Sequence, residues 1–243
     1  MIDIILSLVA AVLAITLHEA AHGYAALAMG DSTAREAGRL SLNPLVHVDR
    51  IGTIVLPLFL AVSQLATMGR IAFMFGWAKP VPVAAWRFRN PRRGMMVVAA
   101  AGPGMNFLLA FAATVVLVAT HTDGGFDDGS MAVAFALAFI QVNIGLGLFN
   151  LLPIPPLDGG RVVVGLLPEA LAARWAKLEK YGVLIVLLFV FIVPEMSRDL
   201  GWKFDPVGAA LNGLMPWLLD LDLRAALWTV LRAADLLAAL GIG

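Results

Sequence analysis

Most of the apolar segments in this sequence are long enough to cross a lipid bilayer, and this constrains the fold more than any other feature. They fall at about residues 4–29, 51–68, 95–119, 131–152 and 181–194, with a weaker one at 206–240. A transmembrane helix needs about 20 predominantly apolar residues. The chain is 60% hydrophobic and 14% charged, whereas a soluble domain is about half apolar and a quarter charged. We therefore expect an all-α polytopic membrane protein with about four to six transmembrane helices.

The composition also excludes several kinds of site. The formal net charge is zero and the pI is about 6.9, so nothing points to nucleic acid. The chain has no cysteine, which excludes disulfides, thiolate zinc sites and a cysteine nucleophile. The first 29 residues lack a positively charged start and contain a long apolar run. We therefore expect a retained transmembrane helix there and not a cleaved signal peptide.

The connecting segments differ in charge, which predicts the topology. Residues 69–94 contain Lys and Arg but no acidic residue, and residues 120–130 contain Asp but no Lys or Arg. An excess of Lys and Arg marks the cytoplasmic side, so we place 30–50, 69–94 and 161–180 inside and 120–130 outside. Segment 51–68 then has inside loops at both ends and cannot cross once. We expect a re-entrant segment that dips into the bilayer, returns and lines a cavity.

The chain is expected to divide into two parts. Residues 1–194 would form the intramembrane core, and residues 195–243 a C-terminal hydrophobic or amphipathic extension. The stretch 221–240 carries its few charges roughly along one helical face. It could therefore lie at the interface or pack as a further span.

The sequence LHEAAHGYA places three ionisable side chains inside the first apolar segment. His18 and His22 are one helical turn apart on the same face, so both imidazoles can reach one metal ion, and Glu19 can take a proton from bound water. An H-E-x-x-H pattern can also arise by chance on a helix surface. In a membrane helix, however, ionisable residues are costly and mark function. These residues therefore indicate an intramembrane metal site.

A catalytic zinc site normally has three protein ligands, and the sequence FNLLPIPPLDGGR offers a third. The helix expected at 131–152 arrives on the inner side, where Pro153, Pro155 and Pro156 break it. Asp158 follows at the depth expected for His22. The alternative is that Asp158 only caps the next helix.

Together these motifs resemble the site-2 protease family of intramembrane zinc metalloproteases. HEAAH is paired with the sequence NLLPIPPLDGG, and LNPLVHVDRIGT, GWAKPVPV and AGPGMN further resemble compact bacterial members without PDZ or CBS domains. The resemblance implies one zinc ion per chain, bound by His18, His22 and Asp158. It implies that Glu19 is the general base and acid, and that Asn150 assists at the substrate carbonyl.

The resemblance also implies that the partners are transmembrane protein substrates and the lipid bilayer. It places the multi-pass chain in a bacterial inner membrane with the active site towards the cytosol. Because a helical substrate must unwind before attack, we expect small β-strands at 38–42 and 79–83 to hold it extended, with the substrate paired against the first.

Three further polar residues have less defined roles. His47 is either a loop histidine, hydrogen-bonded for example to Asp49, or a residue that supports the metal ligands, faces the substrate or binds metal itself. Asn106 and Asn143 are expected to be structural residues that hold helices together, and the alternative for Asn150 is likewise a hydrogen bond between helices. The competing function is a membrane protein that binds or transports metal without catalysis, for which Glu19 would not be needed as a base.

Overall fold

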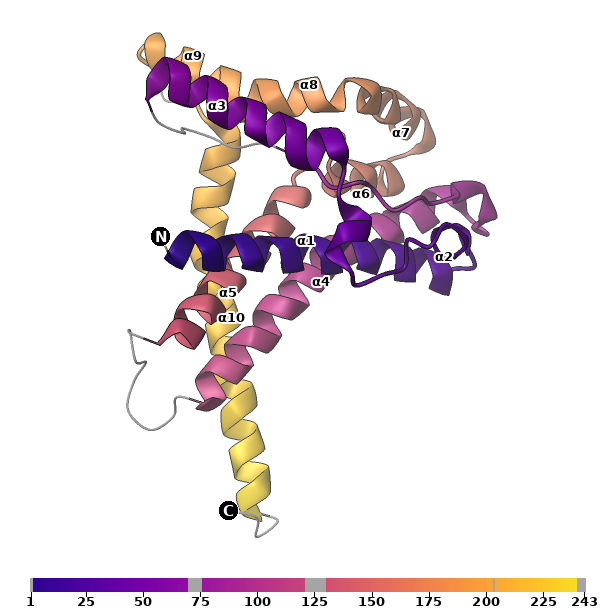
Figure 1. The fold of residues 1–243 in the computed structure, drawn as a ribbon. Coiled ribbons are helices and arrows are strands. Elements are labelled where there is room, and N and C mark those ends of the chain that lie inside the picture. Colours follow the sequence, from indigo (N-terminus) through magenta and orange to yellow (C-terminus); the bar gives the residue numbers. More distant parts are fainter. Residues whose placement is uncertain (1, 70–75, 121–129, 203, 240–243) are drawn as a thin grey trace.

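The structure is a computed structural model that describes residues 2–69, 76–120, 130–202 and 204–239, and its regular elements are helices (Figure 1). The long ones are α1 (Ile2–Ala28), α3 (Leu56–Met68), α4 (Pro91–Thr120), α5 (Met131–Asn150) and α10 (Pro206–Ala239). The short ones are α2 (Thr33–Glu36), η1 (Pro44–His47), η2 (Arg50–Val55), η3 (Ala85–Arg87), α6 (Asp158–Leu166), α7 (Glu169–Ala176), η4 (Lys177–Tyr181), α8 (Gly182–Leu187), η5 (Leu188–Ile192) and α9 (Val193–Asp199).

Helices α1, α4 and α5 pack against one another and form the centre of the fold. Between α4 and α5 lies an apolar cluster of buried residues, Ala110, Leu117, Val133, Ile140 and Ile144. Small residues at these crossings let the helix backbones approach closely, as is common in membrane bundles. Helix α6 then packs against α4, which brings the residues after the proline-rich turn back to the centre.

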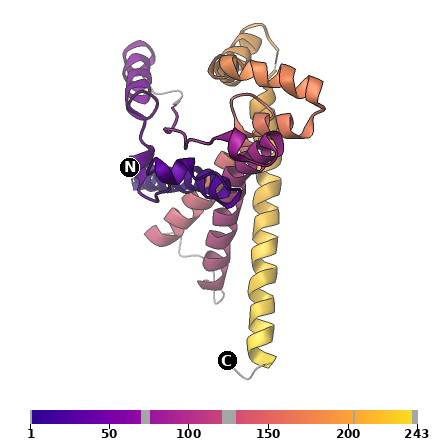
Figure 2. The ribbon, with the colours of Figure 1, turned by 90° about the vertical axis from the view of Figure 1, so that its right-hand side faces the viewer.

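The long helix α10 lies against α4 and α5, where Met215, Leu218 and Leu219 contact the same apolar cluster. The Thr114 hydroxyl of α4 hydrogen-bonds to the Asp222 carboxylate of α10. Beyond this contact α10 extends past the ends of the other helices (Figure 2). The predicted division of the chain at residue 194 falls inside α9 and stays a prediction.

Four helical stretches in the described part of the chain are long and apolar enough to cross a membrane. They are α1, Arg50–Thr67, α4 and α5. Three of them were predicted as spans and Arg50–Thr67 as re-entrant, so the predicted number of four to six transmembrane helices is confirmed only in part. The predicted apolar segment 181–194 is not among them; it forms the short helices α8, η5 and the start of α9, and three charged residues follow in α9, Glu195, Arg198 and Asp199. The acidic segment 120–130 lies almost wholly outside the described residues.

Segment 51–68 does not have the predicted re-entrant shape. Helices η2 and α3 follow each other without a break, so the chain does not reverse inside this segment. Pro57 lies where the π-helix η2 passes into α3, and it has no N–H to donate to the preceding turn. The Gly52 carbonyl in that turn accepts from the Trp77 N–H at 3.1 Å instead. Beyond this segment the chain comes back to the end of α1, because Ala26 of α1 packs against Phe88, which precedes α4, and against Val98 of α4.

The prediction of β-strands at 38–42 and 79–83 is wrong, because neither segment forms a strand. The backbone of 79–83 has other partners: the Arg39 side chain donates to the Lys79 carbonyl at 2.6 Å, and the Val81 N–H binds a side chain. The two prolines of this segment have no N–H to donate. The segment is therefore held by the side chains of Arg39 and Glu19 and by one backbone hydrogen bond, from the Lys79 N–H to the His47 carbonyl, and not by a β-ladder.

Candidate metal centre

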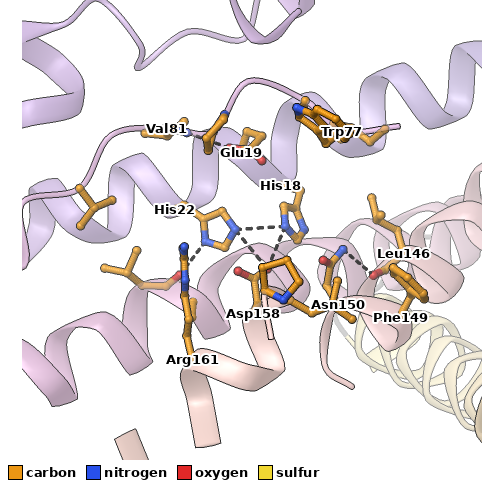
Figure 3. Close-up of a pocket in the computed structure, with 18 of the residues that line it drawn as sticks. His18, Glu19, His22, Trp77, Val81, Leu146, Phe149, Asn150, Asp158 and Arg161 are labelled. Atoms are coloured by element: carbon orange, nitrogen blue, oxygen red, sulfur yellow. Dashed lines mark hydrogen bonds and ion pairs between the residues drawn. The ribbon is translucent and has the colours of Figure 1, made fainter. Parts of the chain in front are cut away.

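Two helices distant in sequence bring His18, His22 and Asp158 together (Figure 3). The Nε2 atoms of His18 and His22 are 3.1 Å apart. They lie 3.1 and 3.3 Å from the same oxygen, Asp158 Oδ2. Three candidate ligand atoms therefore converge on one point, as the spacing of the motifs predicts.

The outer side of each imidazole is held by an oxygen acceptor. His18 Nδ1 lies 2.6 Å from Asn106 Oδ1, and His22 Nδ1 lies 2.7 Å from the Val98 carbonyl oxygen. Because both partners on this side are oxygens that can only accept, each Nδ1 carries the proton and donates it. Each Nε2 then presents a lone pair to the centre, which is the arrangement that metal-binding histidines adopt.

The carboxylate of Asp158 is positioned for a cation and not for capping. Asp158 begins α6, but the capping position is Leu157 and no side chain caps this helix. Asp158 is only 8% exposed, and its Oδ2 has no hydrogen-bond partner among the described residues. A buried carboxylate oxygen without a donor, facing two imidazole lone pairs, is costly unless a positive ion completes the group. The donor set of two imidazoles and one carboxylate fits zinc.

Two glycines allow the helices to approach the centre. A Cβ atom on Gly102 of α4 would lie 2.5 Å from His22 Nε2 and 2.6 Å from His18 Cε1. A Cβ atom on Gly159, next to Asp158, would lie 2.2 Å from the Leu151 carbonyl oxygen at the end of α5. Any larger residue at either position would displace the groups that form the centre.

A cavity of about 420 Å³ opens beside the three grouped side chains, and most of its wall is apolar. Glu19 and Asn150 also line it. In Figure 3 Glu19 points towards Val81, while Asp158 lies on the other side of the two imidazoles. Glu19 Oε2 accepts a hydrogen bond from the Val81 backbone N–H at 3.1 Å. Asn150 donates from Nδ2 to the Leu146 carbonyl at 3.0 Å, which leaves its second N–H available to the cavity.

His47 does not line this cavity. It is buried, and its Nε2 lies 2.9 Å from the Ser41 carbonyl oxygen. Asp49, the predicted alternative partner of His47, instead accepts from backbone N–H groups at the start of η2. The His47 carbonyl accepts from the Lys79 N–H at 2.8 Å. His47 thus supports the extended segment that forms one wall of the cavity.

The buried Asp31 fixes the end of the extended wall segment near Ala84. Asp31 is fully buried, and its carboxylate accepts from the backbone N–H groups of Thr33 at 3.0 Å and Ala84 at 2.6 Å. Arg87 lies 3.7 Å away. Burial alone would raise the pKa of the Asp31 carboxyl, but these hydrogen bonds and the Arg87 charge outweigh it and hold the pKa below its usual value. Asp31 therefore stays ionised and ties residue 84 to the end of α1.

The hydrogen bond between Asn106 and Asn143 joins α4 to α5, as expected for packing residues, but the sequence did not indicate the groups that hold the two imidazoles. Asn106 was expected to be a packing residue, yet its amide contacts His18 directly. Asn143 contacts Asn106 in turn. The Val81 N–H and the Val98 carbonyl are backbone groups, so no residue type in the sequence could have indicated them.

Known proteins resemble this chain along most of its length. The model of Peptidase family M50 matches residues 125–193. YwhC of Bacillus subtilis, provisionally named a zinc metalloprotease, is 39% identical over 188 residues, which cover 75% of this chain and 78% of YwhC. Rip2 of Mycobacterium tuberculosis H37Rv, with the same provisional name, is 30% identical over 211 residues, which cover 85% of this chain and 70% of Rip2. No solved structure matches this chain.

Proposed function

The chain belongs to peptidase family M50 and is an intramembrane zinc metalloprotease, and we propose that His18, His22 and Asp158 bind its zinc ion. The resemblance of its motifs to the site-2 protease family is thereby confirmed. The observation that carries the proposal is the convergence of two imidazole Nε2 atoms on the unpartnered, buried Asp158 Oδ2. A transport or storage function is not favoured by any contact in the described residues.

When bound, zinc would polarise the scissile carbonyl and make the attacking water more acidic. Glu19 takes the proton from that water and delivers it to the leaving nitrogen. The Val81 N–H holds Glu19 Oε2, so Oε1 is the oxygen that accepts the proton. The free N–H of Asn150 donates to the carbonyl oxygen of the substrate as negative charge develops on it.

The substrates are peptide bonds within or near the transmembrane segments of other membrane proteins. The cavity beside the centre has a mostly apolar wall, which suits the side chains of such segments. A peptide bond in a helix is not accessible to attack, because its carbonyl and N–H are bonded within the helix. The substrate therefore has to enter the cavity locally unwound.

A Glu19→Gln variant tests the proposed chemistry, since glutamine keeps the shape of the side chain but cannot act as a base. We expect it to retain zinc, measured by metal analysis of the purified protein, and to lose cleavage of a single-pass membrane substrate. Glu169→Gln is the matched control, because Glu169 is exposed on α7. Cleavage that survives in Glu19→Gln would contradict the role of Glu19.

The basic segments support an orientation in which the ends of α1 and α4 nearest the centre face the cytosol from a bacterial inner membrane. Single cysteines in this cysteine-free chain test it. Cysteine at Arg35 or at Trp86, both exposed, should react with an impermeant reagent only from the cytosolic side. Cysteine at Met131, which is 62% exposed at the start of α5, should react from the opposite side. Labelling of Trp86→Cys from outside would overturn the orientation.

A further inference from the structure

Three buried side chains form a continuous hydrogen-bonded path across α1, α4 and α5. His18 Nδ1 lies 2.6 Å from Asn106 Oδ1, and Asn106 Nδ2 donates to Asn143 Oδ1 at 2.9 Å. Asn106 and Asn143 are both fully buried. Water cannot replace any of these contacts without opening the helix packing.

Asn143, at the end of the path farthest from His18, determines which group donates and which accepts in each hydrogen bond. Asn143 Nδ2 donates to the Phe139 carbonyl at 2.9 Å, and a carbonyl can only accept. Asn143 must therefore orient its side-chain oxygen towards Asn106, and Asn106 must donate to that oxygen from its N–H₂ group. This group also points to the Ala14 carbonyl, at 3.4 Å. The remaining atom of the Asn106 amide, its oxygen, then faces His18.

An amide oxygen that faces an imidazole nitrogen determines which ring nitrogen carries the proton. If His18 were protonated on Nε2 instead, the lone pairs of Nδ1 and Asn106 Oδ1 would face each other at 2.6 Å. Both would then be buried acceptors without a donor, which is costly. The same tautomer would place a proton on the nitrogen that faces Asp158 and exclude a metal ion there.

We propose that Asn106 is a positioning residue that holds His18 in the tautomer able to bind zinc, and that Asn143 sets the orientation of Asn106. This inference rests on the proposed ligation of zinc by His18. His22 needs no such residue, because the backbone carbonyl of Val98 accepts from its Nδ1. The two imidazoles are therefore oriented by different groups: a side chain orients His18, and a backbone carbonyl orients His22.

Two substitutions of Asn106 separate positioning from packing. Asn106→Asp keeps an oxygen acceptor for His18 Nδ1 but loses the donor to Asn143. Asn106→Leu has a similar volume and offers no acceptor. We expect Asn106→Leu to weaken zinc binding by about 10- to 100-fold, measured by competition with a chelator, and Asn106→Asp to keep an affinity close to that of the original protein. A packing role alone predicts the opposite order, because aspartate buries a charge and leaves Asn143 without its donor.

A metal-free measurement gives an independent readout. Nitrogen NMR of histidine-labelled, zinc-free protein distinguishes a ring nitrogen that carries a proton from one that does not. We expect His18 Nδ1 to carry a proton in the original protein and in Asn106→Asp, whereas Asn106→Leu should show a mixture of both tautomers. Equal tautomer populations and equal zinc affinities in all three proteins would overturn the inference.

Control variants show which proposal has failed if the result is negative. Thr114→Val removes another buried hydrogen bond of α4, the one to α10, and should lower thermal stability without changing zinc affinity. Loss of zinc affinity in Thr114→Val would show that general loosening of α4 is sufficient and would overturn the inference. His18→Ala should abolish zinc binding. If it does not, the ligand assignment is wrong; if it does and Asn106→Leu binds zinc normally, only the positioning role is wrong.

Discussion

The backbone N–H of Val81 donates a hydrogen bond to the Glu19 carboxylate at 3.1 Å and joins the extended wall segment to α1. The bond holds one oxygen of the proposed general base on the wall of the cavity. Neighbouring contacts keep Val81 in place, because Lys79 binds the His47 carbonyl and Ala84 binds Asp31. The position of Glu19 thus depends on a segment that contains neither a metal ligand nor a helix.

Val81→Pro should slow cleavage without removing zinc. Proline removes the N–H that binds Glu19 together with the buried valine side chain, and the neighbours of Val81 are already prolines. A hydrogen bond to a charged group contributes about 1.5–3 kcal/mol, so a loss of roughly tenfold or more in kcat is expected. Val81→Ala keeps the N–H and serves as the control. Equal rates for the two variants would show that this bond does not orient Glu19.

Gly102→Ala should weaken metal binding far more than Gly104→Ala. The added methyl at Gly102 would lie 2.5 Å from His22 Nε2, whereas nothing lies within 4 Å of a Cβ at Gly104. The imidazoles or α4 must shift, and a shift of the ligands is expected to cost about tenfold or more in zinc affinity. Chelator competition on both purified variants measures it. Similar affinities for the two would mean that α4 does not press on the histidines.

Removal of zinc should lower the thermal stability of the protein. A ligand that binds only the folded state stabilises it by about 2.7 kcal/mol when its free concentration is 100 times its dissociation constant. In detergent, the midpoint temperature of thermal unfolding should therefore be higher with zinc than with a chelator. In Asp158→Asn the two midpoints should coincide. A zinc-dependent midpoint in that variant would argue against Asp158 as a ligand.

Acid should weaken the attachment of the wall segment through Asp31. Its pKa is lower in the folded protein than the value of about 3.9 in an unfolded chain. The resulting stabilisation is fully present above that unfolded value and is lost as the pH falls through the lower, folded value. Below about pH 4 the stability advantage of the original protein over Asp31→Asn should shrink. Thermal midpoints of both proteins at several pH values between neutral and acid test this, and a constant difference would contradict it.

The grouping of the proposed zinc ligands was predictable because a metal site demands particular residue types at particular spacings. His18 and His22 had to share a helix face, and Asp158 had to follow a break at the same depth. The structure groups all three. The residues that support these ligands were not predictable in the same way. An asparagine that hydrogen-bonds to another helix and one that hydrogen-bonds to a histidine are both flanked by apolar residues in a membrane helix, so the sequence does not distinguish them.

The fold was predictable to the level of helices and their length, and less so where local sequence and tertiary contacts disagree. Pro57 suggested an interruption, but the helical stretch continues through it and the Trp77 N–H bonds to the Gly52 carbonyl of the preceding turn. A strand at 79–83 was expected because the substrate must be held extended, but the backbone of this segment bonds to the side chains of Glu19 and Arg39 and to the His47 carbonyl. Such partners come from distant parts of the chain and leave no local pattern.

The grouping of His18 with Asp158 has a consequence for how the protein is made. The chain is synthesised from its N-terminus, so α1 with both histidines enters the membrane long before α6 exists. Until α6 docks on α4, the two imidazoles face no carboxylate and the proposed ligand set lacks one member. An unfinished chain is therefore inert, and the ability to cut other membrane proteins arises only once its core has been completed.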